Sequence, residues 1–335
     1  MKKINSTLFL IFLINSLINS QVFETERGKI EVLGLKKWDA QKLIDSMKAL
    51  NPNKPIHACA AEMKYNFGFI EVSALTYIED FSDLSSMYTI VTIIEDNESS
   101  KVKYLSKPND SLAILKEYKI CDSLIKSNQM LYFVGLQMYY LVKEGNLDSA
   151  KHQLDNYGIE FEKVKPFWDY LLSKNNIEDM NLALWVLKND SNISNRIIAL
   201  SILLNFGNYD AVWWALMDLQ RYEDQQLSIP TIEILRAFNS SPRKIDWTPA
   251  INSIKYILNG TNLFAFQGTL ELLTSTEISP DLSKCLLENS SELIQTFLNA
   301  QHAKTREIAI KFIKQISGNN EITTAEDCKV WLNSL

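Results

Sequence analysis

Three histidines are the residues best suited to acid–base or metal chemistry in this sequence: His57, His152 and His302. They fall in different predicted helices and form no HxxxH, HExxH or Cys/His pattern. The carboxylates are scattered without the spacing of a calcium-binding loop. The sequence also lacks GxSxG, a phosphate-binding P-loop and GxGxxG. We therefore predict no enzyme activity, no catalytic residue, no metal site and no cofactor.

Four cysteines could form disulfides: Cys59, Cys121, Cys285 and Cys328. Four cysteines allow three pairings, and export would permit such bonds. Their spacings are long, no CxxC pair occurs, and each cysteine lies among apolar residues of a predicted helix. Buried free thiols are the simpler interpretation, and the disulfide pattern stays open at this stage.

The most conspicuous aromatic pair is Trp213–Trp214. Consecutive residues of a helix point about 100° apart, so one ring can lie in the core while the other is exposed. An exposed tryptophan could stack on a sugar or contact a protein partner. Trp213 and Trp214 are therefore the candidate interaction residues.

Two arginines recur in a common pattern. Arg196 is followed three residues later by Ala199, and Arg306 is followed three residues later by Ala309. Apolar residues then continue at helical spacing in both places. Each arginine could bind an anion, or it could join neighbouring structural units.

These two copies resemble the HEAT repeat, a helix-turn-helix unit whose turn ends in arginine and whose second helix packs a small residue. The resemblance covers about residues 176–335 and implies a solenoid of stacked helix pairs. In that setting Arg196 would pair with a helix end or an acidic group, for which Asp190 and Asp210 are candidates. The tail resembles a closing segment in which Trp331 helps to cover the last apolar face. The helices at 110–175 could equally be pairs of the TPR kind.

The N-terminal part shows a different periodicity. Residues 29–34, 69–78 and 87–95 are β-branched or alternating and predict strands, whereas 38–50 and 56–67 predict helices. The expected order is therefore β-α-α-β-β.

With this order, residues 28–97 resemble a single POTRA domain. The likeness rests on Ile30, Val32 and Gly34 of the opening strand and on the run Phe67–Phe69 before the second strand. The resemblance implies a periplasmic docking module that can add a partner strand to a sheet edge. The alternative is a small α/β layer that only caps the solenoid.

Met1–Ser20 has the layout of a secretory signal peptide, with Lys2 and Lys3 before the apolar run Leu8–Ile14. We predict cleavage near Ser20–Gln21, with an uncleaved N-terminal anchor as the alternative. The mature protein would then be periplasmic or extracellular. The Lys-, Ile- and Asn-rich composition suits an AT-rich bacterial genome.

Composition limits the remaining possibilities. Only 10 Gly and 8 Pro occur in 335 residues, which favours a helical protein over a turn-rich β fold. The net charge is -6 and basic residues are not clustered, so nucleic acid is not an expected partner. No other segment is long and apolar enough to span a membrane, so we expect no integral membrane segment after signal cleavage.

The predicted fold class is mainly α: a HEAT-like solenoid preceded by a small α/β domain. The expected boundaries are a signal peptide at 1–20, an α/β domain at 21–98, a linker at 99–109 and a helical repeat domain at 110–335. A solenoid offers a surface and does not by itself imply a reaction. We expect an exported non-enzymatic scaffold or adaptor that binds protein partners. The alternative is a glycan- or small-ligand-binding protein that uses exposed aromatic residues.

Overall fold

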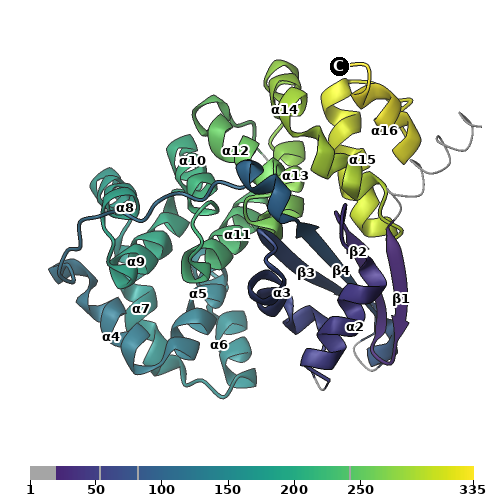
Figure 1. Cartoon of the computed structure of the whole chain (residues 1–335). Coiled ribbons are helices and arrows are strands. Elements are labelled where there is room, and N and C mark those ends of the chain that lie inside the picture. Colours follow the sequence, from purple (N-terminus) through teal and green to yellow (C-terminus); the bar gives the residue numbers. More distant parts are fainter. Residues whose placement is uncertain (1–19, 53, 81–82, 241–242) are drawn as a thin grey trace, which may run out of the picture. The chain divides into compact units, whose positions relative to one another are not determined.

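The computed structural model describes residues 20–52, 54–80, 83–240 and 243–335 (Figure 1). The predicted signal peptide lies outside the described residues except for Ser20. The described part of the chain is mainly α-helical and contains a four-stranded sheet near its N-terminus.

Two compact units divide the chain, and they do not follow sequence order. Unit 1 combines the N-terminal part up to Tyr104 with Arg243–Leu335, and unit 2 is Leu105–Pro242. One boundary falls inside the predicted linker at 99–109. The other boundary was not predicted, because the sequence suggested one continuous helical domain at 110–335. The C-terminal helices group with the α/β part because they cover one face of its sheet.

The sheet consists of β1 (Gln21–Thr25), β2 (Gly28–Leu33), β3 (Glu71–Ile78) and β4 (Met87–Ile94). The strand order is β1-β2-β4-β3. The two central strands, β2 and β4, are parallel, and both outer pairs are antiparallel. Strands β2, β3 and β4 lie where the sequence predicted strands, whereas β1 was not predicted.

Strand β1 forms a hairpin with β2, with Thr25 opposite Gly28. Gly28 has φ +92°, and a Cβ atom there would lie 1.9 Å from the carbonyl oxygen of Met87. Only glycine permits both this backbone conformation and the close approach of β4. The tight turn returns β1 along β2 and makes it an edge strand of the sheet.

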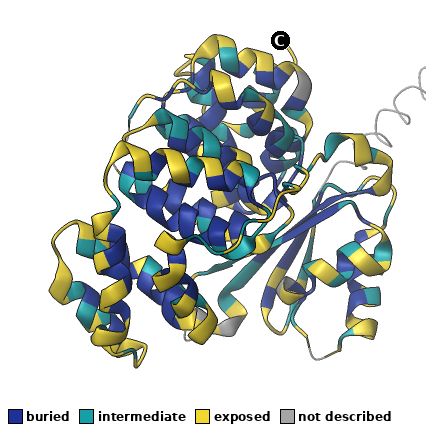
Figure 2. Ribbon diagram, turned by 90° about the vertical axis from the view of Figure 1, so that its left-hand side faces the viewer, coloured by how far each residue is buried: buried dark blue, intermediate teal, exposed yellow. Residues whose placement is uncertain are grey.

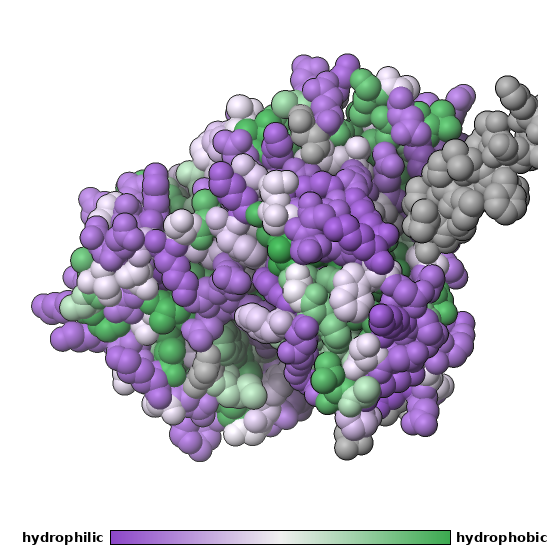
Figure 3. All heavy atoms as spheres, viewed as in Figure 1, coloured by the Kyte–Doolittle hydropathy of each residue, from purple (hydrophilic) through white to green (hydrophobic). Residues whose placement is uncertain are grey.

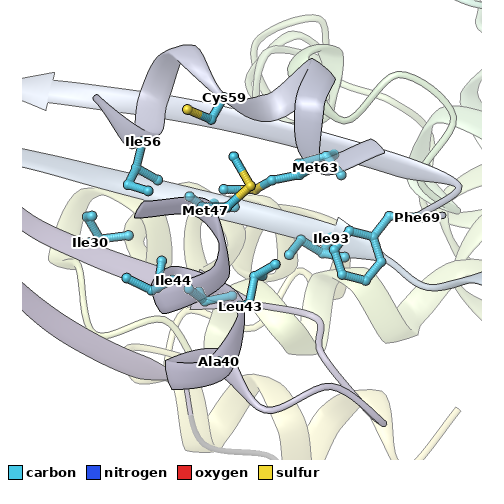
Figure 4. Packing of buried hydrophobic residues seen from close by; sticks show 13 residues of the cluster. Ile30, Ala40, Leu43, Ile44, Met47, Ile56, Cys59, Met63, Phe69 and Ile93 are labelled. Carbon is cyan, nitrogen blue, oxygen red and sulfur yellow. The ribbon is translucent and has the colours of Figure 1, made fainter. Parts of the chain in front are cut away.

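Helices α2 (Ala40–Leu50) and α3 (Ala60–Phe67) cover one face of the sheet. Asp39 caps α2 by accepting a hydrogen bond from the Lys42 N–H at 2.8 Å. Figure 4 shows the core between these helices and the strands. Its buried side chains include Leu43, Ile44, Met47, Met63, Phe69 and Ile93.

The C-terminal helices also belong to unit 1. They are α12 (Ile251–Leu258), α13 (Leu263–Ser275), α14 (Pro280–Leu298), α15 (Ala303–Ser317) and α16 (Ala325–Leu332). Helix α13 contacts β3, where the Tyr77 hydroxyl donates to Gln267 Oε1 at 2.7 Å. Gly260, just before α13, leaves room for the Ile94 side chain, which a Cβ atom would meet at 1.9 Å. Helix α14 is kinked at Ser290.

A charge network also joins distant parts of unit 1. The ammonium groups of Lys36 and Lys101 each contact the carboxylates of Glu98 and Glu292. Glu292 lies on α14, whereas the other three residues belong to the N-terminal part of the chain. The network therefore strengthens the contact between the α/β part and the C-terminal helices.

Unit 2 is built from helices connected by short loops. In chain order they are α4 (Lys119–Ser127), α5 (Gln129–Lys143), α6 (Leu147–Asn156), α7 (Phe161–Ser173), α8 (Ile177–Asn189), α9 (Ile193–Leu203), α10 (Asp210–Leu219) and α11 (Gln225–Asn239). The short helical turn η5 (Leu204–Phe206) follows α9. In Figure 2, buried residues mark the sides of helices that face one another, and exposed residues mark their outer sides.

The segment before α4 departs from the prediction of a helix starting at Asp110. It is extended, and Asp110 forms a parallel bridge with Asp190 at the turn between α8 and α9. The Ser191 N–H donates to the Asp110 carbonyl at 2.7 Å, and the Leu112 N–H donates to Asp190 Oδ1 at 3.1 Å. These long-range bonds replace the local hydrogen bonds of a helix.

Candidate binding surfaces

Arg196 is held against the helix that precedes it. Its Nε atom donates to the Leu187 carbonyl in the last turn of α8 at 3.1 Å. Its guanidinium carbon lies 4.1 Å from the centre of the Tyr222 ring. Burial lowers the pKa of Arg196, and only 2% of the residue is exposed. The sequence suggested a helix end or an acidic group as the partner of Arg196, and the structure shows a hydrogen bond to the helix end.

Arg306 occupies the corresponding place in the first turn of α15. Its Nη1 atom donates to the carbonyls of Ala300 at 2.5 Å and Gln301 at 2.6 Å, in the turn that follows α14. The side chains of Ala199 and Ala309, three residues after the two arginines, are completely buried. Both copies of the pattern thus have the same local role. Each arginine donates to at least one carbonyl group, whereas Arg196 Nη2 is buried without a hydrogen-bond partner among the described residues.

A fully buried carboxylate accompanies each turn, but the two have different origins. In unit 2 Asp190 accepts from the Asn192 N–H at 2.8 Å and from Asn195 Nδ2 at 2.6 Å. In unit 1 Glu31, on strand β2, accepts from the Gln301 and His302 N–H groups, at 3.0 Å for His302. In both places a carboxylate satisfies N–H groups at the start of a helix, where negative charge is favourable.

His302 is the histidine with the most structured environment. Its ring lies between Tyr77 and Tyr88, with ring centres 4.2 and 4.5 Å away. Its Nδ1 atom is 3.0 Å from Thr305 Oγ1, and its residue is 9% exposed. Burial lowers the pKa of His302, against a smaller opposing effect of the Glu31 carboxylate. The cluster fills the contact between the sheet and the start of α15.

The other groups suited to chemistry stand apart. His152 is exposed on α6, and the side chain of His57 lies outside the described atoms. All four cysteines are free thiols, with Cys285 exposed and the others buried. Burial raises the pKa of Cys121 to about 12, which keeps it protonated. Among the described residues, no group of three or more His, Cys, Asp or Glu side chains could hold a metal ion.

The predicted tryptophan pair divides between core and surface. Trp213 is completely buried, and its indole N–H donates to the Gly207 carbonyl at 2.7 Å. Its ring lies 5.4 Å from Phe238, so Trp213 is a core residue and cannot contact a partner. Trp214 is partly exposed. Trp331 is also only partly buried, and α16 covers the end of unit 1 mainly through Cys328 and Leu332.

The sequence reading missed Trp185, an exposed tryptophan on α8. Half of this residue is exposed, and Leu182 and Ile177 on the same helix are also exposed. Ala183, Val186 and Leu187 form the buried side of α8. This periodicity was a usable signal, because residues between the buried positions must point outward.

A groove of about 660 Å³ lies in unit 2. One wall is a stripe of α5 from Phe133 to Tyr140, and the other is one face of α11 from Gln225 to Ala237. Leu204 of η5 also lines it. Elsewhere, on the face shown in Figure 3, apolar patches interrupt a largely hydrophilic surface.

Comparison with known proteins assigns no family to this architecture: no family model matches the chain, and no curated protein or solved structure matches it either. None of the helices in the described ranges combines the length and the apolar character needed to cross a membrane. The fold and its surfaces therefore define a mainly helical protein with exposed apolar sites on unit 2.

Proposed function

We propose that the protein is an exported, non-enzymatic adaptor that binds a protein partner through unit 2. The observation that carries this proposal is the outer face of α8, where Ile177, Leu182 and Trp185 are 48%, 36% and 50% exposed. Trp185 follows Leu182 by three residues, so their side chains are neighbours on the helix surface. Clustered apolar side chains indicate interaction sites, and tryptophan is enriched among the residues that dominate binding energy.

The repeat class belongs to the same proposal. We propose that the helix pairs are HEAT-like, which is supported by the shared carbonyl contacts of Arg196 and Arg306 and by the buried Ala199 and Ala309. The α/β part is proposed to be POTRA-like in element order. Because helices contact its second face, capping of the C-terminal helices is favoured over docking for this part. Export rests on the pattern of Met1–Ser20 alone.

A photo-crosslinking experiment tests the adaptor proposal. A photoreactive residue in place of Ile177, on the same face of α8, should capture a defined protein partner from cell-envelope extract when it is placed in the full chain. Trp185→Ala should reduce recovery of this partner at least tenfold, as expected for an interface anchor worth about 2 kcal/mol. Tyr157→Ala is a matched control, because Tyr157 is a 59% exposed aromatic residue elsewhere in unit 2. Equal recovery with Trp185→Ala and Tyr157→Ala would refute the role of this face.

The second candidate function is binding of a small ligand. Glycan stacking on Trp213 is excluded because that ring is in the core. The groove between α5 and α11 favours a ligand of another chemical class.

A further inference from the structure

The groove in unit 2 has the shape of a ligand site. Its volume of about 660 Å³ lies within the usual range for small-molecule pockets. Phe133, Leu136 and Tyr140 line it from successive turns of α5, and Ile229 and Ile234 line it from α11. Its walls are therefore largely apolar and run along two helices, which suits an elongated hydrocarbon group.

A cation lies at the end of the α5 wall. Lys143 follows Tyr140 by three residues, and its Nζ atom donates to the carbonyl of the lining residue Leu204 at 2.8 Å. Within the described chain no carboxylate lies within ion-pair distance of this ammonium. The carboxylate of the neighbouring Glu144 accepts a hydrogen bond from Tyr140. Burial lowers the pKa of Lys143. The neighbouring Glu144 carboxylate opposes this lowering without an ion-pair contact, and an anionic group at the groove would give the ammonium a direct partner.

A second cation lies near the same end of the groove. Arg236 lines the groove in the last part of α11. Phe238, two residues after Arg236, packs against Gly207, where a Cβ atom would lie 2.7 Å from the Phe238 ring. Gly207 follows Leu204 by three residues, so the end of α11 lies near Leu204. Arg236 is paired with Glu233, which also lines the groove, and both side chains are more than half exposed. An exposed ion pair of this kind contributes little to stability, so Arg236 can exchange Glu233 for another anionic partner readily.

We propose that this groove binds a single-chain anionic amphiphile, with the hydrocarbon chain between α5 and α11 and the acidic head at Lys143 and Arg236. Apolar walls favour the chain by removing it from water. The two cations favour a carboxylate or phosphate head over a neutral one. The site is separate from the α8 face of the adaptor proposal, so either proposal can fail alone.

Calorimetric titration of the full chain tests this site with three probes of equal chain length. Dodecanoate, dodecanol and dodecyltrimethylammonium, each kept at a concentration where it is monomeric, carry an anionic, a neutral and a cationic head. Dodecanoate should bind about tenfold more tightly than dodecanol, because one charge-assisted hydrogen bond is worth about that factor. Dodecyltrimethylammonium should bind more weakly than dodecanol. A lysophospholipid with an anionic head distinguishes a lipid from a free fatty acid as the source of the chain, and binding of either supports the proposal.

Variants separate the apolar and the charged parts of the site. Lys143→Met keeps an apolar side chain of similar length and should remove the preference for dodecanoate while leaving dodecanol affinity unchanged. Gln137→Trp, at an exposed lining position, should fill the groove and weaken all probes. Ile177→Glu on α8 is the matched control and should change none of them, with folding verified by circular dichroism.

Three results would overturn the proposal. Equal affinity for dodecanoate and dodecanol in the wild type, or unchanged selectivity in Lys143→Met, would remove the role of the cations. Absence of binding by every amphiphile would show that the groove is not such a site. Binding of an amphipathic helical peptide that Gln137→Trp abolishes, without any amphiphile binding, would identify a protein element as the occupant instead.

Discussion

The turn before α9 in unit 2 and the turn before α15 in unit 1 share a sequence pattern but are completed by different parts of the chain. Six residues before Arg196 stands Asp190, whose buried carboxylate binds N–H groups of its own turn. Six residues before Arg306 stands Ala300, which has no carboxylate. There Glu31 of strand β2 binds the turn instead.

This difference explains why the C-terminal helices group with the α/β part. Free N–H groups at a helix start need acceptors when they are buried. The first copy carries its acceptor locally, and the extended segment that includes Leu112 also binds it. The second copy depends on a residue from the other end of the sequence. A repeat that lacks its own acceptor thereby becomes attached to the sheet.

The largest effect should follow from removing the distant carboxylate. Glu31→Ala leaves two N–H groups and the Tyr88 hydroxyl without their buried acceptor. We expect the free energy of unfolding to fall by about 3 kcal/mol. Chemical denaturation measures the loss, and hydrogen exchange should increase at both β2 and the start of α15. A loss below about 1 kcal/mol would mean that the carboxylate is not the main link.

Removing the local carboxylate should cost somewhat less. Asp190→Asn keeps one amide oxygen as an acceptor and loses the charge, so we expect a loss of about 2 kcal/mol. Hydrogen exchange should increase at residues 110–115 and 190–196 while the sheet stays protected. Faster exchange in β2 in this variant would contradict the distinction between the two turns.

Replacing the more deeply buried of the two arginines should cause the larger loss of stability. Arg196→Ala removes a buried side chain that contacts Tyr222, and we expect a loss of about 2 kcal/mol. Arg306→Ala removes a more accessible side chain and should cost about 1 kcal/mol. Thermal and denaturant unfolding provide both values. Full stability of Arg306→Ala together with loss of partner binding would instead identify Arg306 as a site residue.

The smallest effect concerns pH, because the helix-start position is Asn192 in one turn and His302 in the other. The pKa of His302 is lowered in the folded state by burial, despite opposing contributions from Glu31 and Glu79; Lys304 and Arg306 lower it further. The unfolded chain therefore binds a proton more readily. The contribution of neutral His302 to the stability of the fold is complete above the pKa of the unfolded chain, near 6.5, and falls as the pH decreases below that value.

His302→Asn tests this contribution by placing the residue of the first turn in the second. Melting temperatures of the wild type and the variant, measured between pH 7.5 and 5.5, should show a smaller decrease on acidification for the variant. The Asn192→Ala variant is the control and should keep the pH dependence of the wild type. An unchanged pH profile in His302→Asn would show that other groups cause the acid sensitivity.

Much of the helical structure was predictable because its causes are local. Caps and apolar spacing predict helices at 129–143, 147–156 and 210–220, and α5, α6 and α10 occupy these ranges to within a residue. Asp39 caps α2 for the same reason. The segment at Asp110 is not helical, because its backbone hydrogen-bonds to the α8–α9 turn, about 80 residues away along the chain.

The candidate sites were less predictable. Trp213 and Trp214 were conspicuous as a pair, but the buried side of α10 determined that Trp213 is a core residue. Trp185 was detectable from the periodicity of α8, whereas the groove was not, because α5 and α11 are far apart in sequence. A surface formed by two distant helices has no continuous pattern that a sequence can display.

The sequence by itself determined the helical class, the N-terminal strands β2, β3 and β4, and the Arg–Ala pattern at both turns. These features depend on periodicity, caps and glycine conformation within short segments. Only the tertiary structure decided that unit 1 joins both ends of the chain, that Glu31 supplies the acceptor missing at Ala300, and that Lys143 lies beside an apolar groove. Those features arise from burial and charge satisfaction between residues that the chain order keeps apart.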